Sequence, residues 1–276
     1  TDAVDSVEAQ TLRAWECIVV DDTGGEGLPR LPGWARVVTT GAEASGVANA
    51  RNVGVAFAQA RYVVFLDADD YLVPHALRYL VQAIEDNPAL SCVYPDSWYA
   101  DAREGRDGKT QWDYRIDPLA PWDCRDALNG KQVHGITAIY RTDAVRAVGG
   151  FDGEAPWEDA DLQVALSVNG YCSALLSLAL YVYRRDMGQR RIAASAERGT
   201  VIAWLKRKWS DYLDGSKQVM GCACTANAGN GSVAVGSPTV DNGPAALSGA
   251  MVEVEYLGTA AAPFSYARTL NGLSPL

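Results

Sequence analysis

The sequence predicts an α/β fold: a mostly parallel sheet with helices on both faces. Three observations support this prediction. Segments with helical and with strand-like periodicity alternate along residues 2–184. Strand-like runs such as "YVVFL" (62–66) are apolar without polar alternation, as in parallel strands buried on both faces. Acidic residues follow two of these runs, at the points where loops leave such a sheet.

Each element of the first half follows from its apolar pattern. Residues 2–13 place apolar side chains on one helical face, and "WECIVVDD" (15–22) is a continuous apolar strand that ends in acids. The pattern then predicts, in order, a strand at 35–40, a helix at 46–60, a strand at 61–70, a helix at 74–86 and a strand at 90–96.

The second half is less regular. Residues 97–130 are rich in Asp, Arg, Gly and Trp without a clear period, which predicts a long surface loop or small insertion of the kind that often carries function. Beyond it the pattern predicts, in order, a strand at 135–141, a short helix at 142–150, a helix at 158–170, a strand at 171–184 and an amphipathic helix at 193–213.

The composition changes near residue 215. Residues 216–249 consist largely of Gly, Ala, Ser, Asn and Thr, which predicts a linker or a disordered segment. "AMVEVEYLG" (250–258) alternates as a half-buried strand does. We therefore predict a globular domain at 1–215, a Gly/Ala/Ser-rich extension at 216–249 and a small β-containing tail at 250–276.

The charge of the chain excludes some partners. A net charge of −10 and a pI near 4.7 argue against nucleic-acid binding, which needs clustered Lys and Arg. No apolar run reaches the ~18 to 20 residues of a membrane span and no signal peptide is present, so we expect a cytoplasmic protein. "WLKRKWSDYL" (204–213) combines aromatic and basic residues. Packing of its aromatic side chains on the domain is the favoured interpretation, and peripheral contact with an anionic membrane is the alternative.

Two acidic clusters end predicted strands: Asp21 and Asp22 in one, and Asp67, Asp69 and Asp70 in the other. The carboxyl ends of parallel strands meet at one edge of a sheet, so we expect the clusters to share that edge. Packed carboxylates repel one another and favour a divalent cation such as Mg²⁺ or Mn²⁺, which would let an acidic protein hold a diphosphate. The competing interpretation is capping of the following helix, which we expect of Asp70.

Three blocks carry a resemblance to a known family. They are "DSVEAQTLRAWECIVVDDTGGEG" (5–27), "GVANARNVGVAFAQARYVVFLDADDYLVPHAL" (46–77) and "VGGFDGEAPWEDADLQVALSVNGY" (148–171). In this order they resemble family 2 glycosyltransferases, with similarity over residues 1–192. The resemblance implies the Rossmann-like GT-A fold and transfer of a sugar from a nucleotide-diphosphate donor, with a UDP-sugar expected, and with inversion at the anomeric carbon.

The resemblance also implies roles for single residues on the donor side. Asp22 would match the acid that reads the nucleotide base, and Arg51 would match a donor contact. Asp67 and Asp69 would match the family's D-x-D motif, with Asp69 on the metal ion and Asp67 on the ribose or the metal.

An inverting transfer needs a general base for the acceptor hydroxyl. The chain has two histidines, so a carboxylate is the leading candidate. "WEDADL" supplies Glu158, Asp159 and Asp161 at the start of a predicted helix, and the family pattern puts the base on Asp159. We expect Asp161 to be solvated or structural. The competing interpretation of the cluster is capping of the helix N-terminus.

The chain departs from the family pattern in two places. The family's first strand, which helps to hold the nucleotide, would precede residue 1, so either the chain is truncated or its donor pocket is incomplete. The family often has a histidine after the last core strand that completes the metal site. Here "YRRDMGQR" has Asp186 in that position, which makes Asp186 a candidate ligand for Mg²⁺ or Mn²⁺.

Two other functions compete with glycosyl transfer. Nucleotidyl transfer uses similar metal and carboxylate chemistry, but the missing Gly-rich phosphate loop and the "WEDADL" block argue against it. A catalytically inactive binding or virion-associated module is the second competitor, because of the missing first strand and the unusual tail. The sequence leaves the acceptor open between a saccharide, a lipid-linked molecule and a protein.

Overall fold

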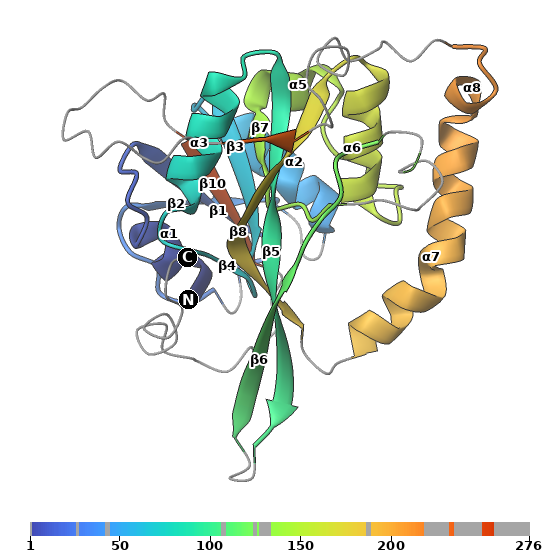
Figure 1. Cartoon of the computed structure of the whole chain (residues 1–276). Coiled ribbons are helices and arrows are strands. Elements are labelled where there is room, and N and C mark those ends of the chain that lie inside the picture. Colours follow the sequence, from blue (N-terminus) through green and yellow to red (C-terminus); the bar gives the residue numbers. More distant parts are fainter. Residues whose placement is uncertain are drawn as a thin grey trace.

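The computed structural model describes residues 2–25, 28–41, 45–105, 109–123, 126, 134–185, 189–217, 232–234 and 250–256. In these residues a ten-stranded sheet runs through the centre of the molecule, with helices on both sides (Figure 1). The predicted α/β class is confirmed. The sheet is mixed, because β7, β4 and β6 run antiparallel to their neighbours.

Most elements lie close to the predicted ranges, but α1 is shorter and β5 longer than predicted, and β4, β6 and β9 were not predicted. The strands are β1 (Trp15–Asp21), β2 (Ala35–Thr39), β3 (Tyr62–Asp67), β4 (Tyr71–Leu72), β5 (Leu90–Glu104), β6 (Thr110–Asp117), β7 (Ile139–Arg141), β8 (Cys172–Arg185), β9 (Ser232–Val233) and β10 (Ala250–Tyr256). The helices are α1 (Asp2–Glu8), α2 (Val47–Phe57), α3 (Ala76–Asp86), α5 (Thr142–Ala147), α6 (Glu158–Val168), α7 (Gln189–Lys208) and α8 (Ser210–Leu213).

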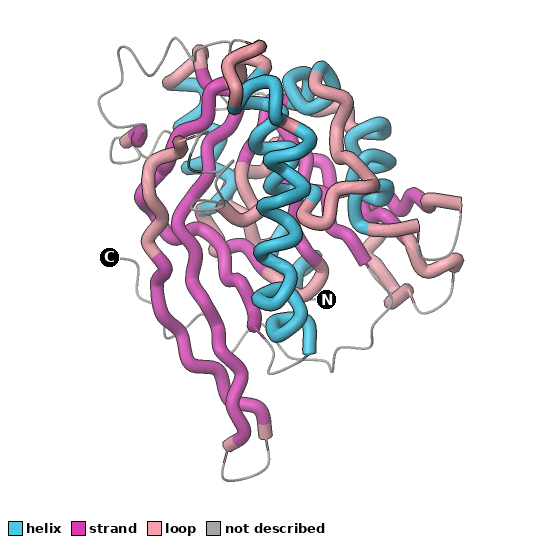
Figure 2. Tube along the Cα trace, turned by 90° about the vertical axis from the view of Figure 1, so that its right-hand side faces the viewer, coloured by secondary structure: helices cyan, strands magenta, loops and turns pink. Residues whose placement is uncertain are grey.

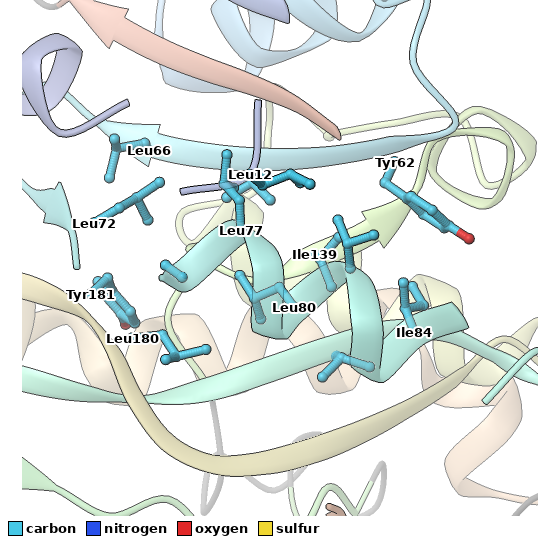
Figure 3. Packing of buried hydrophobic residues seen from close by; sticks show 14 of the residues in the cluster. Leu12, Tyr62, Leu66, Leu72, Leu77, Leu80, Ile84, Ile139, Leu180 and Tyr181 are labelled. Atoms are coloured by element: carbon cyan, nitrogen blue, oxygen red, sulfur yellow. The ribbon is translucent and has the colours of Figure 1, made fainter. Parts of the chain in front are cut away.

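Different helices cover the two faces of the sheet. α1 and α3 pack on one face, and α2, α5 and α6 pack on the other. Figure 3 shows the first of these cores, where Leu77, Leu80 and Ile84 of α3 point at the strands. Each of these three side chains is fully buried, and burial of one such side chain contributes about 1.5–3 kcal/mol. The apolar runs of the sequence therefore become strands buried on both sides.

One strand of the central sheet comes from the far end of the chain. β10 lies between β1 and β3 and is parallel to both, with Val252 aligned with Cys17 on one side and Val64 on the other. Such a position gives hydrogen-bond partners to the facing backbone groups of β1 and β3. The sequence predicts this segment as a strand, but in a tail rather than in the main sheet. The division of the chain into a domain, a linker and a tail stays a prediction.

Of the two alternatives predicted for residues 97–130, a surface loop or a small insertion, the loop is wrong for the first part. β5 and β6 form a long antiparallel ribbon that extends beyond the helices (Figure 2). The period of two in "TQWDYRID" explains why these residues form the strand β6, because Trp112 and Tyr114 turn to the same side and pack against Tyr71 and Val182. Frequent charged residues conceal this alternation in the sequence.

The basic and aromatic segment 204–213 packs on the domain. Trp204 and Trp209 are partly buried against Ala160, Val201 and Leu205. This arrangement agrees with the interpretation that the sequence favoured. None of the helices in the described part of the chain is both long and apolar enough to cross a membrane.

Candidate active site

The candidate site lies where β1, β10 and β3 end. These three strands are parallel, and their register aligns Asp21 with Tyr256 and Glu255 with Asp67. Their carboxyl ends therefore form one edge of the sheet, and the acidic residues that end β1 and β3 lie along it.

Three carboxylates meet in the turn after β3. Oxygen atoms of Asp67, Asp69 and Asp70 all lie within 4.8 Å of one another. Burial raises the pKa of Asp70 well above its usual range, and the negative charges of Asp69 and Asp67 raise it further. The backbone hydrogen bond that Asp70 accepts from Arg184 lowers its pKa, but not enough to offset the burial and the negative charge in this turn.

The predicted role of Asp70 as a helix cap is wrong. α3 begins at Ala76, and its first turn carries no side-chain cap from the preceding His75. Asp70 is instead buried, and its Oδ1 accepts a hydrogen bond from the backbone N–H of Arg184 at 2.9 Å. The strand β4 and three non-helical residues, 73–75, separate Asp70 from the start of α3.

Arg184 fixes this acidic turn, a role that the sequence does not predict. Its guanidinium Nε donates to the carbonyl oxygen of Asp69, and its Nη1 lies 2.7 Å from Asp2 Oδ2. Together with the backbone bond to Asp70, these contacts attach the turn to the end of β8. The signal in the sequence is an arginine directly after the last apolar run, but basic residues in such places are commonly solvated.

The three carboxylates fit a hard divalent cation. Mg²⁺ and Mn²⁺ bind oxygen ligands, and a cation would relieve the repulsion that raises the pKa of Asp70. Asp69 is exposed and Asp67 is partly exposed, so the cluster is accessible from solvent on one side. The third predicted ligand, Asp186, lies outside the described residues.

Arg51 connects this turn to the acidic residues at the start of α6. Its guanidinium is buried, with Nη2 at 2.8 Å from Asp67 Oδ1 and Nη1 at 2.5 Å from Glu158 Oε1. It also lies over the ring of Phe151, 5.5 Å from the ring centroid. One cation therefore holds the first carboxylate of the D-x-D motif and the first carboxylate of "WEDADL" in one network.

Asn52, the neighbour of Arg51, holds the turn that leads to this cluster. Its amide accepts from the backbone N–H of Phe151 and donates to the carbonyl of the same residue, both at 2.8 Å. The preceding Gly150 has φ of +74°, and a Cβ there would lie 2.3 Å from Asn52 Oδ1. Only glycine fits that position.

Asp159 lies in the first turn of α6 beside Glu158. Burial, together with the negative charge of Glu158, raises the pKa of Asp159 to about 6, although the positive charge of Arg51 opposes the rise. A carboxylate that titrates near the working pH suits general base catalysis. The competing interpretation as a helix cap has little support, because α6 begins after Trp157 without a side-chain cap, and the Asp159 carboxylate accepts only from the adjacent Ala160 N–H among the described residues.

Asp22 is held by residues that directly follow β2 and directly precede α2. Its Oδ1 accepts from the backbone N–H of Ser45 and from the hydroxyls of Ser45 and Thr40, and its Oδ2 accepts from the N–H of Gly46. Burial raises the pKa of Asp22, but these hydrogen bonds outweigh burial and lower it overall. Asp22 is thus a fixed anion at the site edge. Neighbouring Asp21 accepts from the N–H and the hydroxyl of Thr23.

Sequence comparison gives independent information on the chain. The model of the family described as "Glycosyl transferase family 2" matches residues 1–149. An uncharacterized glycosyltransferase of Haemophilus influenzae is 30% identical over 120 residues, which cover 43% of this chain and 39% of the relative. The O-antigen biosynthesis protein RfbC of Myxococcus xanthus is 30% identical over 207 residues, which cover 70% of this chain and 15% of the relative. The chain thus spans well under half the length of these relatives.

Solved structures share the fold. S. aureus TarS 1-349 in complex with UDP-GlcNAc has a TM-score of 0.52 at 20% identity, covering 74% of this chain and 61% of TarS. The mannosyltransferase PcManGT from Pyrobaculum calidifontis, in complex with GDP-Man and Mn²⁺, has a TM-score of 0.50 at 20% identity, covering 71% and 55%.

Proposed function

The chain belongs to the family 2 glycosyltransferases, with the GT-A fold, and from this premise we propose that it is a metal-assisted inverting enzyme. It transfers a sugar from a nucleotide-diphosphate donor, with a UDP-sugar expected, to a hydroxyl group of its acceptor. Glycosyl transfer in general follows from the family. The donor, the acceptor, inversion and the residue roles are the proposal.

One observation carries the proposal: buried Arg51 joins Asp67 to Glu158. Asp67 belongs to the turn that would hold the donor diphosphate, and Glu158 precedes the candidate base. A transfer reaction needs the donor and the base within a few ångströms of one reacting centre, because proximity and orientation supply much of the rate. The ion pairs support such an arrangement.

The chemical step uses Asp159 as the general base. Its carboxylate takes the proton of the acceptor hydroxyl while that oxygen forms a bond to the anomeric carbon of the donor sugar. The bond from this carbon to the diphosphate oxygen breaks, and the nucleoside diphosphate leaves with the electron pair. Attack from the face opposite the leaving group inverts the anomeric configuration.

The donor side rests on Asp22, Asp67 and Asp69. We assign Asp22 to the nucleotide base, Asp69 to Mg²⁺ or Mn²⁺, and Asp67 to the ribose or the cation. A bound cation would neutralise charge on the departing diphosphate. Arg51 would contribute to the donor side through Asp67, which it already holds. Asp186 stays a proposed further ligand of the cation.

The acceptor is a saccharide, a lipid-linked molecule or a protein. The β5–β6 ribbon is the element we assign to the acceptor side, because it extends from the same sheet and carries the aromatic side chains Trp98, Trp112 and Tyr114. Peripheral membrane contact through 204–213 stays a prediction, and would depend on Lys206 and Arg207 because Trp204 and Trp209 already pack on the domain.

The test is release of nucleoside diphosphate by the purified chain with Mn²⁺, simple glycoside acceptors and a donor panel that includes UDP-GlcNAc and GDP-Man. We expect release with at least one donor. Asp159→Asn should lower the rate of diphosphate release by about 10²-fold to 10⁴-fold, while donor binding measured by calorimetry is retained. An inactive binding module would bind a donor without release, and absence of both binding and release with every donor would contradict the proposal.

A further inference from the structure

The C-terminal end of α7 contacts the start of α6 through one buried carboxylate. Lys208 Nζ lies 2.6 Å from Asp161 Oδ2, and the indole N–H of Trp209 donates to Asp161 Oδ1 at 2.9 Å. The Asp161 side chain is only 3% exposed. The expectation that Asp161 is structural is therefore supported and solvation is excluded, because both of its oxygens are bound by α7 and its neighbour.

The same ammonium group holds a second carboxylate. Lys208 Nζ lies 2.7 Å from Asp152 Oδ2, in the turn that follows β7 and α5. Asp152 and Asp161 stand on either side of residues 153–160, which include Glu158 and Asp159. A single cation thus ties together the two ends of the segment that presents the candidate base.

Apolar contacts reinforce this attachment. Ala160, next to the candidate base, is buried against Val201 and Leu205 of α7, and the rings of Trp157, Trp204 and Trp209 pack against this cluster. The Lys208 ammonium lies over both rings, 4.9 Å and 5.1 Å from their centroids. Figure 1 shows α7 along the outside of α6. The contact is therefore built from charge, hydrogen bonds and packing together.

The segment needs such a constraint. Residues 153–157 form no helix or strand. Arg51 and Asn52 hold the flanking residues Glu158 and Phe151 from the side of α2. A general base must be held in a narrow geometry, because a displacement of about 1 Å can cost on the order of 10²-fold in rate. Without Lys208 the opposite side of the segment loses its ionic contacts.

We propose that Lys208 is a positioning residue of the active site, which holds Asp152 and Asp161 together and so fixes Asp159 in its catalytic position. This inference rests on the proposed function. Lys208 touches neither donor nor acceptor in this proposal. It acts through the geometry of the first turn of α6, which the last residue of α7 supports through its two ion pairs.

The test compares Lys208→Met with Lys206→Met, which removes the same charge from an exposed position two residues away on the same helix. We expect Lys208→Met to lower kcat about 10-fold to 100-fold with KM for the donor changed less than about twofold. Lys208→Arg should restore most of kcat, because it keeps the charge. Hydrogen exchange should accelerate at the Asp161 amide, which donates to Trp157 O, in Lys208→Met only.

Asp161→Asn provides a second route if Lys208→Met does not fold. It removes the ion pair but keeps the shape and the contact with Trp209, and it should reproduce the loss of kcat. Wild-type kcat in both variants, or an equal effect of Lys206→Met, would overturn the inference. So would a parallel loss of kcat and donor affinity, which indicates general destabilisation. If the wild-type chain releases no diphosphate while Lys208→Met still exchanges the Asp161 amide faster than the wild type does, the result contradicts the proposed function instead.

Discussion

Two acidic clusters joined by Arg51, the start of α6 and the turn at 67–70, are neutralised in different ways. The cluster at the start of α6 has its own cations: Arg51 pairs with Glu158, and Lys208 pairs with Asp161. The turn at 67–70 shares Arg51 through Asp67 but leaves Asp70 buried, with its pKa raised by burial and by its acidic neighbours. Asp159 is also buried with a raised pKa, but both of its acidic neighbours are held by cations of the protein, whereas the three carboxylates of the turn lie close enough together to suit a cation from solution. The proposed reaction needs both properties: a base whose neighbours the protein holds in place, and carboxylates that can bind the metal of the diphosphate.

The largest effect on stability should come from Arg51→Met. The substitution leaves Asp67 and Glu158 without their shared cation, and breaking a buried ion pair of this kind costs about 3 kcal/mol or more. Urea denaturation at pH 7 measures the loss. A loss below about 1 kcal/mol would mean that the network does not organise the first cluster.

Arg184→Met should weaken the second cluster while sparing the first. It removes the guanidinium contacts with the Asp69 carbonyl and with Asp2 but keeps the backbone N–H that binds Asp70. We expect a loss of about 2 kcal/mol in unfolding free energy, since hydrogen bonds to charged groups contribute about 1.5–3 kcal/mol. Mn²⁺ affinity should fall as well. Unchanged Mn²⁺ affinity would show that Arg184 does not hold the cation site.

The pH dependence of turnover should report the first cluster. Asp159 acts as a base only when ionised, and its pKa is raised to about 6. We expect kcat to fall about tenfold per pH unit below 6 and to be flat above it. Because the folded state holds this proton more strongly than the unfolded state, the unfolding free energy should decline as pH rises from about 4 to 6. Asp159→Asn should reduce that decline without abolishing it, because burial also raises the pKa of Asp70. An unchanged decline in Asp159→Asn would assign the titration to other groups.

The smallest effect serves as the control. Arg61 and Glu85 form an ion pair at 3.3 Å in which the arginine side chain is 52% exposed. Arg61→Met should therefore change the unfolding free energy by about 0–1 kcal/mol. A change as large as that of Arg51→Met would indicate that burial does not distinguish the two arginines.

Local patterns predicted most of the fold, whereas the resemblance to a known family supplied the roles proposed for the candidate residues. Continuous apolar runs identify β1 and β3, and the acids that follow them lie at a common edge because the strands are parallel. The alternation at 250–256 identified a strand but gave no partner. Its place between β1 and β3 depends on the pairing of Ala250 with Trp15 and Tyr62, which precede it by 235 and 188 positions, and no local period encodes such pairing.

Side-chain partners were the part that could not be predicted. Arg51 and Glu158 are 107 residues apart, and Asp70 and Arg184 are 114 apart. Pattern reasoning assigned Asp70 to a helix cap because the following helix is near in sequence, whereas the end of β8 is nearer in space. Tertiary contacts of this kind decide which carboxylates are neutralised and which can bind a cation.

Mn²⁺ titration of the wild-type chain and of two variants, with calorimetry in the presence of UDP, tests the contrast between the clusters most directly. Asp69→Ala removes a carboxylate of the turn, and Asp159→Asn removes the candidate base. We predict one Mn²⁺ bound per wild-type chain, the same affinity in Asp159→Asn, and a loss of about 10²-fold or more in Asp69→Ala. Equal Mn²⁺ affinity in all three proteins, or a loss in Asp159→Asn as large as that in Asp69→Ala, would contradict the account.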